Sequence, residues 1–271
     1  NTAASPDQAI DLSAPGAIAW EGFRMEEGTF HINDLSGAEA FGWWGNWIAD
    51  VGTVQEEKLE IREVPKEIPV HRYLAGEIGS PGILWVSVQL RPGGLNSPEP
   101  VSLCLGNDTR KRALQVGLFP DSAEWRLKGD FVFNAPIRSG VSAVADEETH
   151  LILKLDFSIQ KGQIWIDPLH FGSPVPDEGV SFSLRPGLEI DRIMVEGTSV
   201  DEAPASTVDS ISLASSPEHL QFPPNERWLY WKIPEIPVID LTPWFPQFGR
   251  VNISERPWIY SYKTNDWYYL S

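Results

Sequence analysis

The chain has 271 residues, with 21 basic and 38 acidic side chains, so its formal net charge is −17. Because 42% of the residues are hydrophobic, wholesale disorder is excluded, and the chain is long enough for one large core or two smaller ones. An acidic surface without a run of Lys and Arg repels phosphate groups. The composition therefore argues against nucleic acid and anionic membranes as partners.

The first part of the chain carries the period of β-strands. Apolar and polar residues alternate over 151–157, 114–118 and 180–184, and no window keeps a helical apolar stripe over three turns. Further strand candidates are residues 18–24, 59–64, 83–90, 101–105, 131–134, 163–167, 190–195 and 210–213. Gly, Pro, Asn and Asp separate these runs. The pattern predicts an all-β chain of short strands, folded as a sandwich or barrel.

The composition changes after residue 216. Residues 217–271 hold 13 aromatic side chains and 8 prolines, and prolines at this density interrupt regular elements. We therefore predict a sandwich domain over 1–216 and an irregular C-terminal extension over 217–271. So many aromatic side chains need a surface to cover them, either the sandwich or a partner. The candidates for this interface are Trp228, Trp231, Trp244, Phe245, Trp258, Tyr260, Trp267 and Tyr268.

The order of several motifs resembles the concanavalin A-like jelly roll, in particular laminin-G-like modules of secreted bacterial proteins. The motifs are Trp20–Phe23 with Gly42–Trp47, Ile83–Val88, His150–Phe157 with Gln163–Pro168, and the closing pair Asp191–Val195 and Asp209–Leu213. The resemblance covers about residues 18–215 and implies a two-sheet antiparallel sandwich. Trp258–Tyr260 and Trp267–Tyr269 also resemble the aromatic endings of some bacterial surface proteins.

A tryptophan cluster lies in the segment Phe41–Trp47. Flat indole faces stack well on sugar rings, which makes Trp43, Trp44 and Trp47 candidates for sugar stacking. The alternative is that they fill the core, as large aromatic side chains usually do. Because alternate residues of a strand point to opposite faces, Trp43 and Trp44 cannot both be displayed on one face.

Catalytic and metal-binding signals are weak. Jelly-roll glucanases use paired carboxylates on one strand face, but Glu189 and Glu196 are seven residues apart and so lie on opposite faces unless a bulge intervenes. The single Cys104 and five scattered His form no metal-ligand spacing. We expect no catalytic residue, no metal site and no cofactor. Calcium on acidic loops is the alternative, at Asp34, Glu56, Glu57, Asp146, Glu147, Glu148, Asp177, Glu178, Asp201 and Glu202.

The first residues, Asn1–Asp7, have no initial Met and no apolar leader, which is typical of a processed, exported protein. We therefore expect an extracellular, cell-surface or periplasmic protein. The expected role is a non-catalytic structural or adhesive subunit of a surface or multiprotein assembly, with other subunits or surface glycans as partners. One alternative is a lectin-like carbohydrate-binding module. A second is a glycoside hydrolase or polysaccharide lyase of the jelly-roll type.

Overall fold

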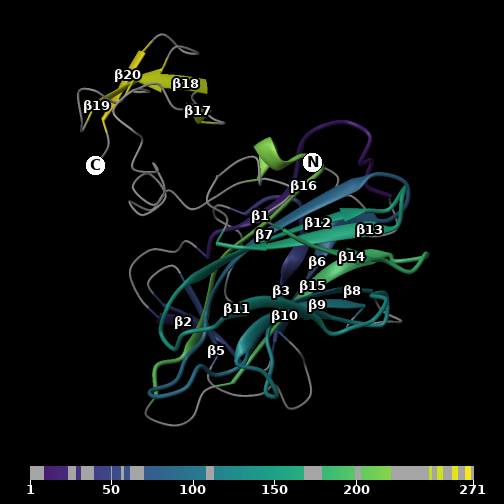
Figure 1. Cartoon of the computed structure of the whole chain (residues 1–271). Coiled ribbons are helices and arrows are strands. Elements are labelled where there is room, and N and C mark those ends of the chain that lie inside the picture. The colour runs from purple at the N-terminus through teal and green to yellow at the C-terminus, as the bar shows by residue number, and fades with distance from the viewer. Residues whose placement is uncertain are drawn as a thin grey trace.

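The computed structural model describes residues 9–23, 29–31, 40–49, 51–55, 58–61, 70–107, 113–167, 179–198, 203–220, 244–245, 249–252, 258–261 and 266–269. Figure 1 shows two β-sheets packed face to face, with strands in both layers running in similar directions. All strand pairs in the two sheets are antiparallel, which confirms the prediction of an all-β, concanavalin A-like jelly-roll sandwich.

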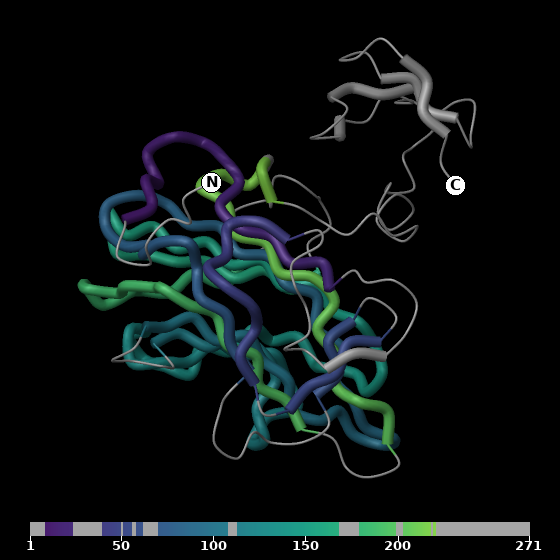
Figure 2. The backbone as a smooth tube through the Cα atoms, turned by 180° about the vertical axis from the view of Figure 1, so that it is seen from behind, coloured from purple at the N-terminus to yellow at the C-terminus, as the bar shows by residue number. Residues whose placement is uncertain are grey.

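The first layer is a sheet with nine described strands. Its order is β14 (Val180–Ser183), β13 (Lys161–Ile166), β12 (Thr149–Asp156), β7 (Ile83–Arg91), β16 (Ser206–Ala214), β5 (Lys58–Ile61), β4 (Thr53–Gln55) and β2 (Thr29–His31). β1 (Ala17–Glu21) also pairs with β16. In Figure 2 the purple N-terminal strand runs beside the light green strand β16, so the beginning and the end of the sandwich meet in one layer.

The second layer has seven strands within the described ranges. Its order is β11 (Ile137–Ser142), β10 (Glu124–Lys128), β9 (Leu114–Leu118), β8 (Val101–Gly106), β15 (Ile190–Gly197), β6 (Val70–Ile78) and β3 (Trp43–Ile48). Strand β3 is therefore the edge strand beside β6, and β11 forms the opposite edge.

The core lies between the two sheets and follows from the period of the strands. One row of directly opposed residues crosses the second sheet and is apolar throughout, consisting of Ile137, Leu127, Val116, Leu103, Val195 and Val70. From the first sheet, Leu151, Leu153, Leu155 and Phe157 enter the same core, as the alternation predicts. Burying one such side chain stabilises the fold by about 1.5–3 kcal/mol.

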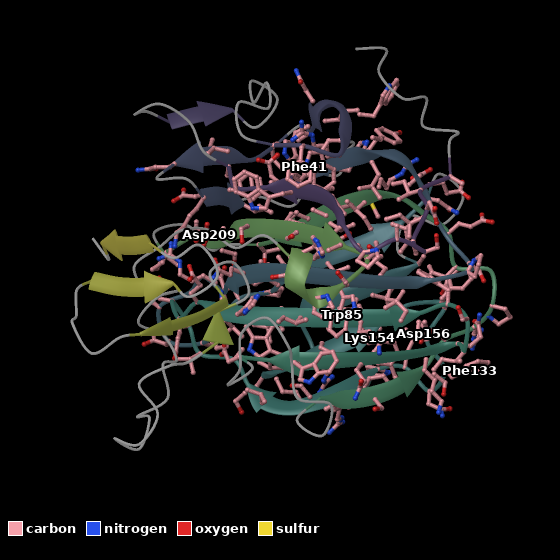
Figure 3. All side chains as sticks on the ribbon, turned by 90° about the horizontal axis from the view of Figure 1, so that it is seen from above. Phe41, Trp85, Phe133, Lys154, Asp156 and Asp209 are labelled. Atoms are coloured by element: carbon pink, nitrogen blue, oxygen red, sulfur yellow. The ribbon has the colours of Figure 1, made fainter. Side chains whose placement is uncertain are left out.

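A smaller apolar cluster lies on the outer face of the first sheet. The indoles of Trp85 and Trp165 stack with ring centroids 5.7 Å apart, and Ile152 and Leu220 pack against them. Lys154 lies over the Trp85 ring at 5.5 Å (Figure 3). Both tryptophans are buried, but outside the space between the sheets, because they alternate with the inward residues of β7 and β13. A 3-10 turn at Pro217–His219 brings Leu220 to this cluster.

Four short strands of the C-terminal region correct the prediction of an irregular extension. β17 (Trp244–Phe245), β18 (Gly249–Asn252), β19 (Trp258–Ser261) and β20 (Asp266–Tyr269) form an antiparallel sheet. The four described strands contain no proline, so the ladder hydrogen bonds that a proline would remove are all available. The prediction failed because it counted prolines over the whole region rather than between the aromatic runs.

Some strand predictions also need correction. Residues 131–134 form turns with one isolated bridge, from Val132 to Leu184, and Asn134 adopts a φ of 58°, which ends an extended run. Strands β2, β3, β4, β6, β10 and β11 are missing from the list of predicted strands. In β6 an inward position is occupied by Arg72, which interrupts the expected apolar alternation.

Leu153 provides a test of the register. Its side chain is 2% exposed and lies opposite Val86 and Ile164. Leu153→Ala should lower the free energy of unfolding by about 2–5 kcal/mol, because it removes transfer energy and leaves a cavity. Leu95→Ala is the matched control, since Leu95 is 69% exposed and should cost little. Urea denaturation of both variants measures the difference, and equal losses would contradict the register.

Candidate functional site

The outer face of the seven-stranded sheet carries aromatic and polar residues in register. One row consists of Trp44, Tyr73, Arg192 and Gly106. The next consists of Ile48, His71, Met194, Cys104, Gln115 and Lys128. Directly opposed residues share a face, and these rows alternate with the apolar core rows. We call this surface the outer face.

The β3 end of the outer face displays an indole ring. Trp44 is 42% exposed, and its ring meets Tyr73 edge-on, with centroids 5.9 Å apart and an interplanar angle of 86°. The ring of His71 contacts Tyr73 from a neighbouring position, with centroids 5.4 Å apart. Packing against Tyr73 fixes the orientation of Trp44 while much of its surface stays open, which is the arrangement that stacking on a flat apolar ligand face requires.

A bulge in β3 separates the three candidate tryptophans. Trp44 lies opposite Tyr73, but Ile48 lies opposite His71, so β3 holds two more residues than β6 between these pairs. Gly45, with a φ of 73°, makes the left-handed turn that the bulge needs. As a result Trp47 turns inward and is 2% exposed.

Trp43 and Trp47 make hydrogen bonds and ring contacts within the sandwich. The Trp43 indole N–H donates to the carbonyl of Trp20 at 2.8 Å, and its ring packs against the core. The Trp47 indole N–H donates to Glu21 at 3.0 Å, and its ring packs on Phe23. Of the three sugar-stacking candidates, only Trp44 lies on the outer face.

A buried ion pair connects the two sheets beneath this site. Arg72 of β6 points inward and pairs with Glu21 of β1, and both residues are 4% exposed. Glu21 also accepts hydrogen bonds from the Phe23 amide and the Trp47 indole, each at 3.0 Å. Burial lowers the pKa of the Arg72 guanidinium, and the Glu21 carboxylate opposes that change.

Arg72 also holds the bulge that positions Trp44. Its Nε donates to the carbonyl of Gly45 at 3.1 Å, and its guanidinium lies 5.5 Å from the centroid of the Trp43 ring. The carbonyl belongs to the residue that follows Trp44. The interior ion pair therefore fixes the backbone on which the displayed indole is mounted.

Polar groups continue from the aromatic end across the outer face. The guanidinium of Arg192 lies 4.3 Å from the Tyr73 ring centroid, and its Nε donates to Asp191 at 2.8 Å. Two strands further on, the Gln115 amide donates to Ser102 at 2.8 Å and to Glu196 at 2.9 Å. Arg192, Gln115 and Ser102 are each only 3–4% exposed, so these groups satisfy one another within the structure, and the open part of the outer face is its β3 end.

The predicted pairing of carboxylates on 189–196 can now be placed. Glu189 precedes β15 and is exposed, whereas Glu196 lies on the outer face with Arg192, four residues earlier. Glu196 accepts from Gln115, and Asp191 pairs with Arg192. Each of the two carboxylates on β15 has a polar partner within the sheet, and we assign no reaction to them.

A cavity of about 320 Å³ lies near the aromatic end, where Ala75 of β6 and Gly42 contribute to its lining. Its other walls include Ile10, Ile18 and Ser215. The Ser215 hydroxyl already donates to the carbonyl of Ala14 at 2.6 Å and accepts from the Gly16 amide at 2.8 Å. The cavity therefore offers mainly small apolar walls.

The acidic loops that could hold calcium are partly described. Asp146 pairs with Arg91 at 3.2 Å, and Glu148 pairs with Lys58 at 2.8 Å, so these carboxylates have protein cations as partners. Within the described ranges, no group of three or more His, Cys, Asp and Glu is arranged to hold a metal ion. The remaining candidates lie outside the described residues, apart from Glu147, namely Asp34, Glu56, Glu57, Asp177, Glu178, Asp201 and Glu202.

The predicted interface of the C-terminal region has no described side chains. Trp228 and Trp231 lie outside the described residues. The backbone of β17, β19 and β20 carries the other candidates, with Trp258 opposite Tyr269 and Tyr260 opposite Trp267 in register. Elsewhere, none of the described residues forms a helix with the length and hydropathy needed to cross a bilayer.

Comparisons with known proteins find likeness only among solved structures; no protein family and no curated protein matches. A sialidase aligns with a TM-score of 0.45 and 16% identity over 65% of this chain and 17% of its own. A Trypanosoma rangeli sialidase in complex with sialic acid aligns at 0.45 and 12% over 74% and 31%. Arcelin-5, a lectin-like defense protein from Phaseolus vulgaris, aligns at 0.41 and 9% over 74% and 97%.

These likenesses concern the fold, and the chain spans less than a third of the sialidase chains. They correct one expectation. We expected a chain without catalytic activity, but sialidases are enzymes, and they are among the structures that this chain resembles. The β-sandwich therefore does not by itself identify a non-catalytic protein.

The sequence pattern made Trp44 a candidate but gave no sign of its neighbours on the outer face. Tyr73 and Arg192 were missed because their importance depends on the pairing of β6 with β15, which are more than 100 residues apart in the chain. The only local signal was the alternation of His71, Tyr73 and Ala75 with inward residues in β6. Even if β6 had been predicted as a strand, its pairing with β3 would also have been needed to place Tyr73 beside Trp44.

The buried ion pair gives the next prediction. Arg72→Met should destabilise the protein by about 3–5 kcal/mol, because it leaves the Glu21 carboxylate buried without its cation. Glu21→Gln combined with Arg72→Met should recover part of this loss, since neither charge then remains. Urea unfolding of the single and double variants measures the coupling. If the two losses simply add, the pair does not act as a unit.

Proposed function

We propose that the chain binds carbohydrate at the outer face, with Trp44 as the stacking platform. The observation that carries the proposal is the half-exposed indole of Trp44, held edge-on by Tyr73, with Arg192 next in the same row. Sugar rings present an apolar C–H face and a rim of hydroxyl groups. An aromatic ring beside donors and acceptors matches both features.

The part of the outer face that is open to a ligand is its β3 end. Trp44 is 42% exposed there, whereas Arg192, Gln115 and Ser102, towards the middle of the sheet, are only 3–4% exposed. The proposed site is therefore confined to Trp44 and the neighbouring rings of Tyr73 and His71.

The role of the C-terminal region remains a proposal. We place the boundary of the sandwich unit just after Leu220, because this side chain is 4% exposed and packs with Trp85 and Trp165. The four-stranded sheet beyond it would form a second unit that contacts a partner or the sandwich. Export to the cell surface or beyond fits a glycan-binding role and is part of the same proposal.

The test is the variant Trp44→Ala. A glycan array on the purified chain first identifies bound sugars, and isothermal titration calorimetry then measures affinity. We expect Trp44→Ala to weaken binding about tenfold or more, because loss of an aromatic stacking surface costs at least about 1.4 kcal/mol. Mass spectrometry of the sugar after incubation separates binding from cleavage.

The matched control is Ile48→Ala. Ile48 is on the same strand and face and is 39% exposed, but it has no aromatic ring. Its affinity should stay close to that of the natural chain, and both variants should keep their melting temperature. Equal losses of affinity, or an array without any bound glycan, would refute the proposed site.

A further inference from the structure

We propose that the sugar on Trp44 carries an acetamido group, which enters the cavity beside this indole. The inference rests on the proposed function, because it names the class of sugar that binds there and extends the same site by one pocket. Residues 9–16 form one wall of the cavity. We call this segment the strap and the cavity the strap pocket.

The strap pocket lies one step along the chain from both rings of the stacking platform. In β6, Tyr73 and Ala75 are successive outward residues, about 7 Å apart at the usual rise of a strand. Gly42 lies two residues before Trp44, and its carbonyl accepts from the Ala75 amide at 2.9 Å. Ala75 and Gly42 line the pocket. Tyr73, Ala75 and Gly42 are half-buried and Trp44 is exposed, so the surface from platform to pocket is open to solvent.

Contacts at three points hold the strap in place. The Ile10 amide donates to a carbonyl of β6 at 2.7 Å. Leu12 is buried against Gly82, where an added Cβ atom would lie 2.4 Å from the Leu12 side chain. The Gly16 amide donates to the Ser215 hydroxyl at 2.8 Å. The wall of the pocket therefore has a fixed position before a ligand binds, which lowers the entropy cost of binding.

The walls of the strap pocket are apolar except at Asp11. The Ser215 hydroxyl is already engaged by backbone groups of the strap. The volume, about 320 Å³, is at the lower end of the range of roughly 300–1,000 Å³ for ligand pockets. Such a pocket favours a small group with an apolar part. The apolar side chains of its lining are Ala9, Ile10, Ala14, Ala17, Ile18 and Ala75.

Asp11 supplies the polar contact of the strap pocket. Its Oδ1 accepts from the Ser13 amide at 2.8 Å, and hydrogen bonds from Ser13 lower the pKa of the Asp11 carboxyl. The ionised carboxylate only accepts hydrogen bonds, so the ligand group needs a donor beside its apolar part. An acetamido group has both, an N–H and a methyl. An ammonium also donates, but its charge is costly to place between apolar walls.

The experiment measures the affinity of the full chain for two sets of sugars by isothermal titration calorimetry. The first set consists of three trimers with a β-1,4-linked glucose skeleton, which carry acetamido, hydroxyl or ammonium at carbon 2. The second set is N-acetylgalactosamine and galactose, with the other configuration at carbon 4. In at least one set, the acetamido sugar should bind about tenfold more tightly than its hydroxyl counterpart, as expected for one buried methyl and one charge-assisted hydrogen bond.

The variants Ala75→Leu and Asp11→Ala test the pocket itself. Ala75→Leu fills part of the space, and Asp11→Ala removes the acceptor. Each should reduce affinity for the acetamido sugar about fivefold to tenfold, because it removes either the methyl contact or the hydrogen bond. Neither should change affinity for the hydroxyl sugar. Trp44→Ala, in contrast, should weaken binding of both sugars equally.

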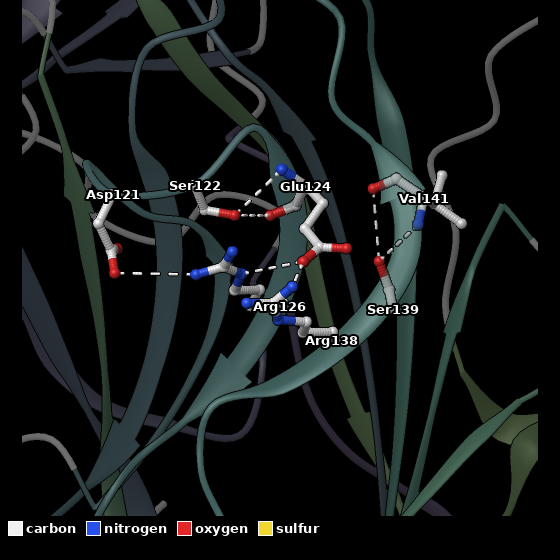
Figure 4. Close-up of polar contacts among 7 residues, drawn as sticks. All are labelled: Asp121, Ser122, Glu124, Arg126, Arg138, Ser139 and Val141. Atoms are coloured by element: carbon white, nitrogen blue, oxygen red, sulfur yellow. Dashed lines mark hydrogen bonds and ion pairs between the residues drawn. The ribbon is translucent and has the colours of Figure 1, made fainter.

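Matched controls come from the opposite side of the same sheet. Ala123→Leu and Asp130→Ala make the same changes at exposed positions. Ala123 precedes Glu124, which pairs with Arg126 and Arg138 in the cluster shown in Figure 4. Both controls should keep the preference for the acetamido sugar. Melting temperatures verify that each variant folds.

The outcomes separate this inference from the proposed function. If the hydroxyl sugar binds as tightly as the acetamido sugar and Trp44→Ala weakens both, the acetamido specificity is overturned and the sugar site stands. Tightest binding of the ammonium trimer also overturns it, because Asp11 would then select a cation. Equal losses in the controls overturn it as well. If no sugar of either set binds, the inference fails, and the glycan array alone decides the proposed function.

Discussion

The ion pair between Glu21 and Arg72 is the constraint on which the arrangement of this protein depends. It is the point where a strand of one sheet is bound to a strand of the other by charge rather than by apolar packing. Removing both charges from water has a large desolvation penalty. The attraction between the charges offsets this penalty only when hydrogen bonds also satisfy their remaining donors and acceptors. Glu21 meets this condition through the Phe23 amide and the Trp47 indole, and Arg72 meets it through the Gly45 carbonyl.

The need to satisfy these buried donors and acceptors restricts the geometry of the residues around the ion pair. Apolar side chains tolerate small shifts, but a buried ion pair with directional hydrogen bonds has one good arrangement. The tryptophan segment is therefore held in a single register although it lies at the edge of the sheet. The same residues account for the buried indole of Trp47, the bond of the Trp43 indole to the β1 backbone, and the exposed indole of Trp44.

The two faces of the seven-stranded sheet carry different kinds of residue. The inward rows are apolar, apart from Arg72, and stabilise the sandwich. The outward rows carry charged, aromatic and small residues, which are buried in the middle strands and open to solvent at Trp44. Recognition can thus change without loss of the fold, which is why sandwiches of this kind occur in proteins with different activities.

The sequence predicted the features that depend on local period. The strands around Leu153, Val116 and Phe182 were identified because their alternation is regular. Opposite placement of Trp43 and Trp44 also followed from alternation alone. The position of Arg72 could not be predicted, because a buried arginine makes sense only beside Glu21, which is 51 residues away in the chain.

The bulge in β3 has a consequence for solubility. An exposed edge strand offers unpaired backbone groups to other chains, and a flat edge can extend into intermolecular sheet. At Gly45 the left-handed backbone and the extra residues interrupt the regular spacing of those groups, so a second copy cannot add a continuous strand beside β3. The bulge that displays Trp44 therefore also protects this edge against aggregation. Without the bulge, β3 would be a regular, tryptophan-rich edge strand with which another chain could pair.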